Sequence, residues 1–568
     1  MQRQPPVAPD DEIERYVRTY TSLLRSSGEV RIRALEESHA YSGSSLHAGA
    51  LEPAPDVSAF AYAAARLPDE MPRIVRVVLG QSREVFETAG FEVRSWERVR
   101  TRGRRRPLRF DGERTLAVFI ASESDIDDLV PILVAWQIEW NKLHARLAPL
   151  PEKAFSPPDP AALCSALAIA PEDLEALRQA LRPEAFDAGL AELRAHPSDL
   201  RVRVLAPSYS QYQRAAQRWW SGVVPATLRA GKAHATPVYF VSSNTHAIAN
   251  LVGGYARRHR DAIVRYACEK DPEALREPVE KAVESGDETL LLPLLYYLMR
   301  GWIHDAGGDS RMREVRAAEA EVGLVHLAEP GHILVDAQGV EIAKLSRDLL
   351  DPRLEMPGLE ALRESDAYIL NIDYPLGMAA YHLLSRVGQG VGELRGIYVM
   401  GKAATLNGRV GDVMLSSAVY DEHSRNTFLL RNAFTAASVR PWLRHGDVFD
   451  NQSALTVRSA FLQNRNYMNA FYRDGYTVLE MEAGPFLSAC WELGWPTRVP
   501  SDEIVNVGGD GGLEIGLLHY ASDTPYSRRQ SLLSKSLSYF GVDSTYACAI
   551  AIVRRIFERE IERRRAGG

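Results

Sequence analysis

Apolar and polar residues along the second half of the chain are arranged in blocks typical of strands followed by helices. Short apolar runs have the length of strands, and helical spacing follows most of them: "TPVYFV" (236–241), "AYILNI" (367–372), "GIYVM" (396–400), "TVLE" (477–480) and "IGLLHY" (515–520). Apolar strands separated by helices indicate a mixed or parallel sheet covered on both faces. The pattern predicts an α/β domain over residues 236–568.

Helical spacing dominates the first 235 residues. It covers about residues 11–66, the segment 71–90 that stops at Gly90, and much of 148–235. Residues 115–147 read as a buried strand, a polar turn and a long helix. We expect residues 1–235 to form a mostly helical α+β region that regulates, oligomerises or covers the site.

A basic cluster, "RTRGRRRP" (100–107), separates two runs that alternate as strands do. It is either a solvated hairpin tip or a contact for an anion or nucleic acid. Patches that bind nucleic acid come with interleaved aromatic residues or a recognisable module, and the cluster has neither. We therefore predict a solvated hairpin tip.

Composition and charge set broad limits. A chain of 568 residues suggests two or three domains, and a net charge of −7 gives no global bias toward nucleic acid or membrane surfaces. The 4 cysteines form no CxxC pair, which argues against a disulfide framework and a cysteine-based zinc site. The chain has neither the apolar core of a signal peptide nor an apolar stretch of about 18 residues. We expect a cytoplasmic protein with no metal and no nucleic-acid or membrane partner.

Polar residues follow four of the predicted strands. They are Ser242–His246 after Val238–Val241, Met400–Ala404 after Ile397–Val399, Glu480–Glu482 after Thr477–Leu479, and Tyr520–Pro525 after Leu517–His519. Ligands of open α/β sheets bind outside the carboxyl ends of the strands. If the four strands share one sheet, two acids, a lysine and a histidine could lie along one edge. An acid at such a position is, alternatively, a helix N-cap.

The order of these segments and their amino-acid sequences resemble the nucleoside phosphorylase and nucleosidase superfamily. The matching pieces are "GIYVMGKAATLNGRVGDVML", "VLEMEAGPFLSACWE" and "LLHYASDTP". The layout, with a long region before the catalytic domain, is most similar to the AMP nucleosidase subgroup. The resemblance spans roughly residues 236–560 and implies a three-layer α/β/α domain with a central mixed sheet, which cleaves the N-glycosidic bond of a purine nucleoside or nucleotide.

The resemblance also implies roles for the acids. Asp523, beside Ser522, would protonate the leaving base, which requires a raised pKa. Glu482 would accept hydrogen bonds from the ribose hydroxyls, and Met481 would pack against the sugar. Glu480 either contacts the substrate or makes a structural salt bridge, because successive strand residues face opposite ways.

The anion site departs from the family pattern. The family usually has Gly-Ser-x-Gly-Gly, or Gly-His in the AMP nucleosidase subgroup, where this chain has the turn Gly401-Lys402-Ala403-Ala404. Lys402 either holds phosphate, as a co-substrate, or fills the pocket and excludes it. The family also has an asparagine in the segment that corresponds to residues 374–380, and this chain lacks it. Phosphate apart, no cofactor is expected.

Five further residues are candidates for binding substrate. His246 and His423, with the nearby Arg425, would contact a 5′-phosphate or ribose, or else lie on the surface. Arg465 and Tyr467 lie where the family places base-binding residues, and Tyr467 either stacks on a purine or packs in the core.

Three functions stay open on the sequence. They are a nucleosidase, a phosphorylase that uses Lys402, and a non-catalytic nucleotide-binding or regulatory protein. In each case the partner is a small nucleoside or nucleotide. The resemblance also implies a homo-oligomer.

Overall fold

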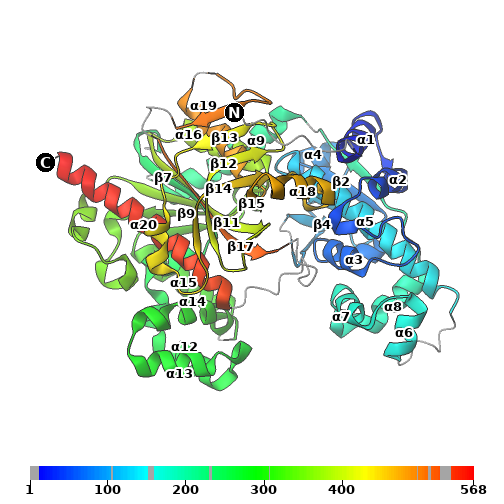
Figure 1. The fold of residues 1–568 in the computed structure, drawn as a ribbon, viewed down its shortest axis with the longest axis horizontal. Helices are drawn as coiled ribbons and strands as arrows, with labels where there is room; N and C mark the ends of the chain where they lie inside the picture. The colour runs from blue at the N-terminus through cyan, green and yellow to red at the C-terminus, as the bar shows by residue number, and fades with distance from the viewer. Residues whose placement is uncertain are drawn as a thin grey trace.

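Two β-sheets lie beside each other along the long axis of the computed structural model, with helices around both (Figure 1). The structure describes residues 12–103, 106–150, 159–206, 208–228, 233–305, 307–495, 497–508, 513–524 and 539–567. One sheet uses strands between Val30 and Val204, and the other uses strands from Pro237 onward. The α/β class expected from the sequence is confirmed.

The first sheet has 6 strands in the order β1-β6-β2-β5-β4-β3. Its centre is parallel, because β2 pairs in parallel with both β5 and β6, and the outer strands are added antiparallel. The strands are β1 (Val30–Arg31), β2 (Arg76–Gly80), β3 (Glu97–Val99), β4 (Leu108–Phe110), β5 (Thr115–Phe119) and β6 (Arg201–Val204).

Helices cover both faces of this sheet. On one face Val77 and Leu79 pack under most of the helices, and on the other Val78 packs against Phe86 of α4 (Arg83–Thr88), as the two-residue alternation of a strand requires. The helices of the first face are α1 (Glu12–Ser26), α2 (Arg33–Tyr41), α3 (Val57–Ala64), α5 (Ser124–Leu147), α6 (Pro160–Leu167), α7 (Pro171–Ala180) and α8 (Phe186–Ala195).

Helix α9 (Tyr209–Thr227) lies before the predicted boundary at residue 235 but packs on the second sheet. Trp219 and Trp220 are buried there in one core with Val238, and Trp219 donates a hydrogen bond of 2.9 Å to the carbonyl of Val335. Helix α9 therefore joins the two regions, because it precedes the predicted boundary in the sequence and packs on the second sheet.

The second sheet is mixed and has 11 strands in the order β16-β13-β12-β14-β15-β11-β7-β10-β9-β8, with β17 pairing both β11 and β12. Because of this double pairing, β12, β14, β15, β11 and β17 form a closed ring of strands. The strands are β7 (Pro237–Ser242), β8 (Leu324–Leu327), β9 (Ala337–Glu341), β10 (Tyr368–Ile372), β11 (Glu393–Thr405), β12 (Val413–Asp421), β13 (Thr427–Leu430), β14 (Val448–Thr456), β15 (Tyr476–Glu480), β16 (Ile504–Val507) and β17 (Glu514–Asp523).

This sheet is the middle of three layers. Val238 and Phe240 face one core with α9, α16 (Met378–Gly390) and α19 (Ala483–Gly494), whereas Tyr239 and Val241 face the other. The opposite layer contains α10 (Ala247–Gly253), α11 (Tyr255–Arg258), α12 (Arg260–Lys270), α13 (Arg276–Ser285), α14 (Glu288–Asp305), α15 (Asp309–Glu321), α17 (Ala436–Val439) and α20 (Tyr539–Gly567), which crosses the view diagonally in Figure 1.

Two local predictions were wrong. The segment 71–90 is not one helix, because it contains β2 and then α4. The predicted turn after Ile397–Val399 is also absent, since β11 continues to Thr405. The predicted hairpin around residues 100–107 is confirmed by the β3–β4 pairing, but Arg106 is buried and pairs with Asp125 and Asp128 rather than lying in solvent.

Among the described residues, no helix combines the length and apolarity needed to cross a membrane.

Candidate functional site

Strand pairing brings three of the four predicted strand ends together. In β11, Ala404 pairs with Leu479 of β15 on one side and with Asp523 of β17 on the other. Neighbouring strands are about 4.8 Å apart, so Asp523 and Leu479 lie about 10 Å apart across β11. Lys402 precedes Ala404 by two residues, and Glu482 follows Leu479 by three.

Asp523 ends β17 in a half-buried position. A register shift opposite Ala403 and Ala404 leaves Ser522 without a partner in the strand pairing, and its hydroxyl donates 3.2 Å to Asp523 Oδ2. Burial raises the pKa of the Asp523 carboxyl, and Ser522, Lys402 and Arg66 offset this only in part. An acid with a raised pKa can carry a proton nearer to neutral pH than a solvated one.

Lys402 is a solvent-exposed residue beside this acid. The protein around its ammonium group desolvates it and lowers its pKa, and the negative charge of Asp523 offsets only part of that effect. Gly401 has open space for a side chain, because an added Cβ would come no closer than 3.8 Å to the Tyr374 ring. This glycine therefore forms neither the expected turn nor a close backbone approach.

Glu480 is fully engaged inside the protein. Its Oε2 accepts hydrogen bonds of 2.6 and 2.7 Å from the amides of Glu482 and Ala483, and its Oε1 accepts one from the Thr456 hydroxyl. The Thr456 hydroxyl in turn accepts 2.9 Å from the amide of Gly484. Burial raises the pKa of Glu480 to about 7 despite these bonds. Glu480 therefore anchors the start of α19, with backbone donors in place of the salt bridge considered above.

Glu482 and Met481 lie half-buried above this anchor. Glu482 is the N-cap residue of α19, and Met481 packs beside a small apolar cluster that contains Phe471 and Leu479. Tyr467, in α18 (Arg465–Arg473), joins the same cluster, and its ring meets Phe471 edge-on at 4.5 Å. Met481 and Tyr467 thus combine core packing with partial exposure.

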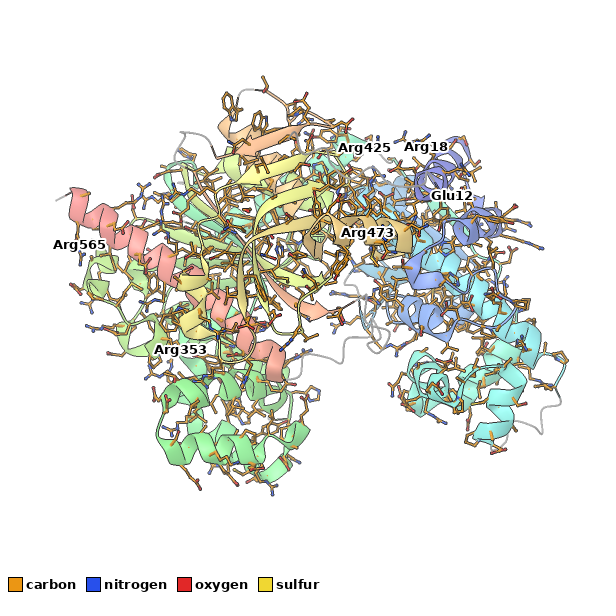
Figure 2. The ribbon with its side chains drawn as sticks, in the orientation of Figure 1. Glu12, Arg18, Arg353, Arg425, Arg473 and Arg565 are labelled. Atoms are coloured by element: carbon orange, nitrogen blue, oxygen red, sulfur yellow. The ribbon has the colours of Figure 1, made fainter. Side chains whose placement is uncertain are left out.

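The remaining binding candidates are dispersed. His246 is exposed and is the N-cap residue of α10, after β7, whose Ser242 pairs with Val399 of β11. Arg425 lies close to α1 in Figure 2, where Glu14 pairs with it at 3.7 Å. Arg465 begins α18, but its side chain lies outside what the structure describes.

His423 is buried in a contact between the two regions of the chain. Its Nδ1 is 2.9 Å from Asp421 Oδ1, and its Nε2 is 3.1 Å from the hydroxyl of Ser124, at the start of α5. The Ser124 hydroxyl also accepts 2.9 Å from the amide of Met378. Burial alone would lower the pKa of His423, but Asp421 outweighs it and raises that pKa.

This Ser–His–Asp arrangement has the spacing of a nucleophilic triad, but its serine is closed to substrate. Ser124 is 0% exposed, and the backbone of Gly377 (φ +52°) lies against it, so that a Cβ on Gly377 would come within 2.5 Å of the Ser124 Cβ. The arrangement holds α5 to the start of α16 and to the end of β12. His423 therefore serves this contact instead of a solvent-open pocket.

Two residues near these groups were missed by the sequence reasoning because they come from the first region. Arg66, after α3, lies close enough to Asp523 for its charge to act on the acid, and Ser124 bonds His423. Arg66 also lies over the ring of Tyr62, with its guanidinium carbon 3.4 Å from the ring centre. Neither residue belongs to a motif, so no local signal could have identified it.

The arrangement around Asp523 can donate a proton from a half-buried acid, while Glu482 offers a carboxylate to hydroxyl groups. Both lie at the ends of buried strands, which hold them more rigidly than a free loop would. Among the described residues, no group of three or more His, Cys, Asp or Glu side chains could hold a metal ion.

Comparisons with known proteins give a family and distant structural likenesses. A family model described as a family of unknown function, DUF6909, matches residues 32–558. No curated protein matches the chain. Isoform 2 of uridine phosphorylase from Schistosoma mansoni is 12% identical, with 34% of this chain and 70% of that chain covered and a TM-score of 0.24.

Two more solved structures are similar at the same level. A protein described as a methylthioadenosine nucleosidase from Weissella paramesenteroides is 10% identical, with 42% and 92% covered and a TM-score of 0.28. A methylthioadenosine phosphorylase from an Antarctic soil metagenomic library is 7% identical, with 34% and 70% covered and a TM-score of 0.25. Scores this low assign no function to this chain.

Proposed function

Because the chain belongs to DUF6909, a family of unknown function, we propose its activity from the site itself: cleavage of the N-glycosidic bond of a purine nucleoside or nucleotide. Asp523 protonates the leaving base, and Glu482 binds the ribose hydroxyls. The observation that carries the proposal is the pairing of Ala404 with both Leu479 and Asp523, which brings the two resembling motifs to one place. A small nucleoside or nucleotide is the proposed partner.

Asp523 and Glu482 could both lower the energy of an oxocarbenium-like transition state. Protonation makes the base a better leaving group, and general acid catalysis of this kind contributes about 10²–10⁴-fold. The pKa of Asp523 is raised by burial, which favours the protonated form that the step needs. Glu482 would accept hydrogen bonds from a diol, and its negative charge would stabilise the developing cation.

Water is the proposed nucleophile, and phosphate is the second candidate. The observation that favours phosphate is Lys402, a cation beside Asp523 that could hold an anion next to the sugar. Hydrolysis would give free ribose or ribose 5-phosphate. Phosphorolysis would require phosphate and give ribose 1-phosphate from a nucleoside or ribose 1,5-bisphosphate from a nucleotide, so the two reactions differ in both requirement and product.

The test is incubation of the purified full chain with AMP, adenosine, inosine and uridine, with and without phosphate, followed by chromatography of bases and sugars. We expect purine release that is independent of phosphate. Release only with phosphate would replace hydrolysis by phosphorolysis. No base release by folded protein, together with tight nucleotide binding that Asp523→Asn leaves unchanged, would favour the non-catalytic alternative.

A further inference from the structure

A cavity of about 230 Å³ lies in the first region, away from the Asp523 site. Helices α1, α5 and α9 and the end of β6 form its walls. Its polar lining residues are Thr21, Arg25, Glu123, Asp127, Tyr209 and Tyr212. None of them belongs to the motifs that led to the proposed function.

The cavity lies at the carboxyl edge of the parallel strands of the first sheet. Glu123 follows β5, Val204 ends β6, and Tyr209 begins the helix after β6. The helix after β2 covers one face of the sheet and the helix after β5 covers the other. Adjacent parallel strands whose connections leave to opposite faces create a crevice at this edge, where α/β proteins bind ligands.

Two buried polar atoms at this cavity lack hydrogen-bond partners among the described residues. They are the hydroxyl of Tyr212, a residue only 4% exposed, and Oε2 of Glu123, which is 3.9 Å from Nε2 of His382, close enough for charge attraction but too far for a hydrogen bond. The side chain of Gln81 lies near the Tyr212 hydroxyl but makes no hydrogen bond of ordinary geometry with it. Buried polar atoms are nearly always paired, so two unpaired atoms at one cavity indicate an occupant that pairs with them.

The charges select the kind of occupant. Burial alone would raise the pKa of Glu123, but His382 outweighs it and lowers that pKa, so Glu123 is a carboxylate that can only accept hydrogen bonds. Asp127 adds a second acid, whose Oδ1 already accepts 2.6 Å from the Tyr20 hydroxyl. Burial raises the pKa of Asp127, and the positive charge of Arg458 offsets this only in part. Arg25 is exposed at the rim. The occupant must therefore donate hydrogen bonds.

The aromatic lining agrees with a positive charge. The ring of Tyr212 borders the cavity, and aromatic faces attract cations. Tyr209 also borders the cavity, but the guanidinium carbon of Arg498 already lies 5.5 Å from the centre of its ring. We propose that this cavity binds a small organic cation that carries a primary amine or a guanidine. The N–H groups of the cation donate hydrogen bonds to the carboxyl groups of Glu123 and Asp127. The volume limits the ligand to a size below that of a typical drug molecule.

The bound cation would act on the second region through α16. Glu123 Oε2 is 3.9 Å from Nε2 of the buried His382, whose ring lies 5.3 Å from Tyr209 and 6.0 Å from Tyr212. Four residues before His382, Met378 bonds Ser124. A ligand that neutralises Glu123 would weaken its attraction for His382, which links the cavity to the contact between the regions.

The experiment is calorimetric titration of the full chain with putrescine, a small diamine, and with 1,4-butanediol, its uncharged analogue. We expect saturable binding of putrescine alone. Glu123→Gln and Asp127→Asn should each weaken it about tenfold to hundredfold, because each removes a charge-assisted hydrogen bond. Glu52→Gln, at an exposed acid outside the cavity, is the matched control.

Tyr212→Phe keeps the test decisive if an acid variant fails to fold. The hydroxyl it removes has no hydrogen-bond partner within the described part of the chain, so the melting temperature should not fall, whereas putrescine affinity should fall about two- to tenfold. Absence of saturable putrescine binding, equal binding of butanediol, or equal loss in Glu52→Gln would overturn the proposal. Because the readout is binding, these outcomes do not depend on glycosidase activity.

Discussion

The two sheets have similar carboxyl edges but differ in what covers them. In the first sheet, the residues after β5 pack against the second region, where Ser124 bonds His423 and Met378. In the second sheet, the ends of β15 and β17 leave Glu482 and Asp523 half-buried. The same sequence pattern, a polar group after a buried strand, thus serves an internal contact in one sheet and forms the candidate reactive site in the other.

Burial of the individual group explains this difference. Glu480 receives three donors and supports α19, although it stands two residues from Glu482. Among the described residues, the Asp523 carboxyl accepts a hydrogen bond from the Ser522 hydroxyl. A carboxylate whose acceptor sites are filled by the protein has little capacity left for a substrate, whereas an incompletely paired one retains it.

The largest expected effect is the loss of activity in Asp523→Asn, which distinguishes the candidate reactive acid from the structural acid Glu480. Asp523→Asn should lower purine release about 10²–10⁴-fold, because the amide cannot supply the proton, while the free energy of unfolding changes little at this half-buried position. Steady-state rates and urea unfolding measure the two quantities. The matched variant Ser522→Ala should lower the rate far less. Unchanged release in Asp523→Asn would remove this residue as the acid.

Glu480→Ala should show the opposite profile. Loss of the acceptor leaves the Thr456 hydroxyl and two backbone amides of α19 unpaired, which should cost about 2–4 kcal/mol in the free energy of unfolding measured with urea. A variant as stable as the wild type would contradict the anchoring role.

The pH dependence of Glu480→Gln tests the same anchor. A group whose pKa is raised in the folded state contributes stability at low pH and loses it as pH rises through the folded pKa. Between the ordinary value of 4.5 and about 7, the wild type should therefore lose stability relative to Glu480→Gln. Urea unfolding at intervals of pH gives this difference. A constant difference across that range would contradict the raised pKa.

Ser124→Ala tests the contact between the carboxyl edge of the first sheet and the second region. It removes one hydrogen bond to His423 and leaves the Met378 amide unpaired, so the free energy of unfolding should fall by about 1–3 kcal/mol. Ser221→Ala is the control, because the hydrogen bonds of the Ser221 hydroxyl within the described structure are with Gln217 of its own helix. Equal effects in the two variants would mean that Ser124 does not join the regions.

The smallest expected effect concerns Lys402. Its positive charge lowers the pKa of Asp523, so Lys402→Met should raise that pKa. An acid must be protonated to donate, and activity falls as pH rises through its pKa. The alkaline limb of the kcat/KM profile should therefore move to higher pH in this variant, by a fraction of a unit. A shift to lower pH would contradict this assignment.

Much of the second region could be predicted from the sequence. The strands around Val238–Val241 and Thr477–Leu479 lie within β7 and β15 as expected, because long apolar runs with helical spacing behind them have few alternatives. The segment 71–90 was mispredicted because the short run that became β2 also fits a helix face. Pairing with β5 and β6 on both sides decided its conformation.

The sequence by itself determined the α/β class, the buried strands and the acids that follow them, because these depend on local spacing and side-chain chemistry. Only the tertiary structure decided which acids stay available. The Glu480 carboxylate is occupied by Thr456 and the start of α19, His423 is enclosed by Ser124, and Asp523 lies beside Lys402 and Arg66. The physical reason is that burial and hydrogen-bond saturation depend on residues distant in the chain.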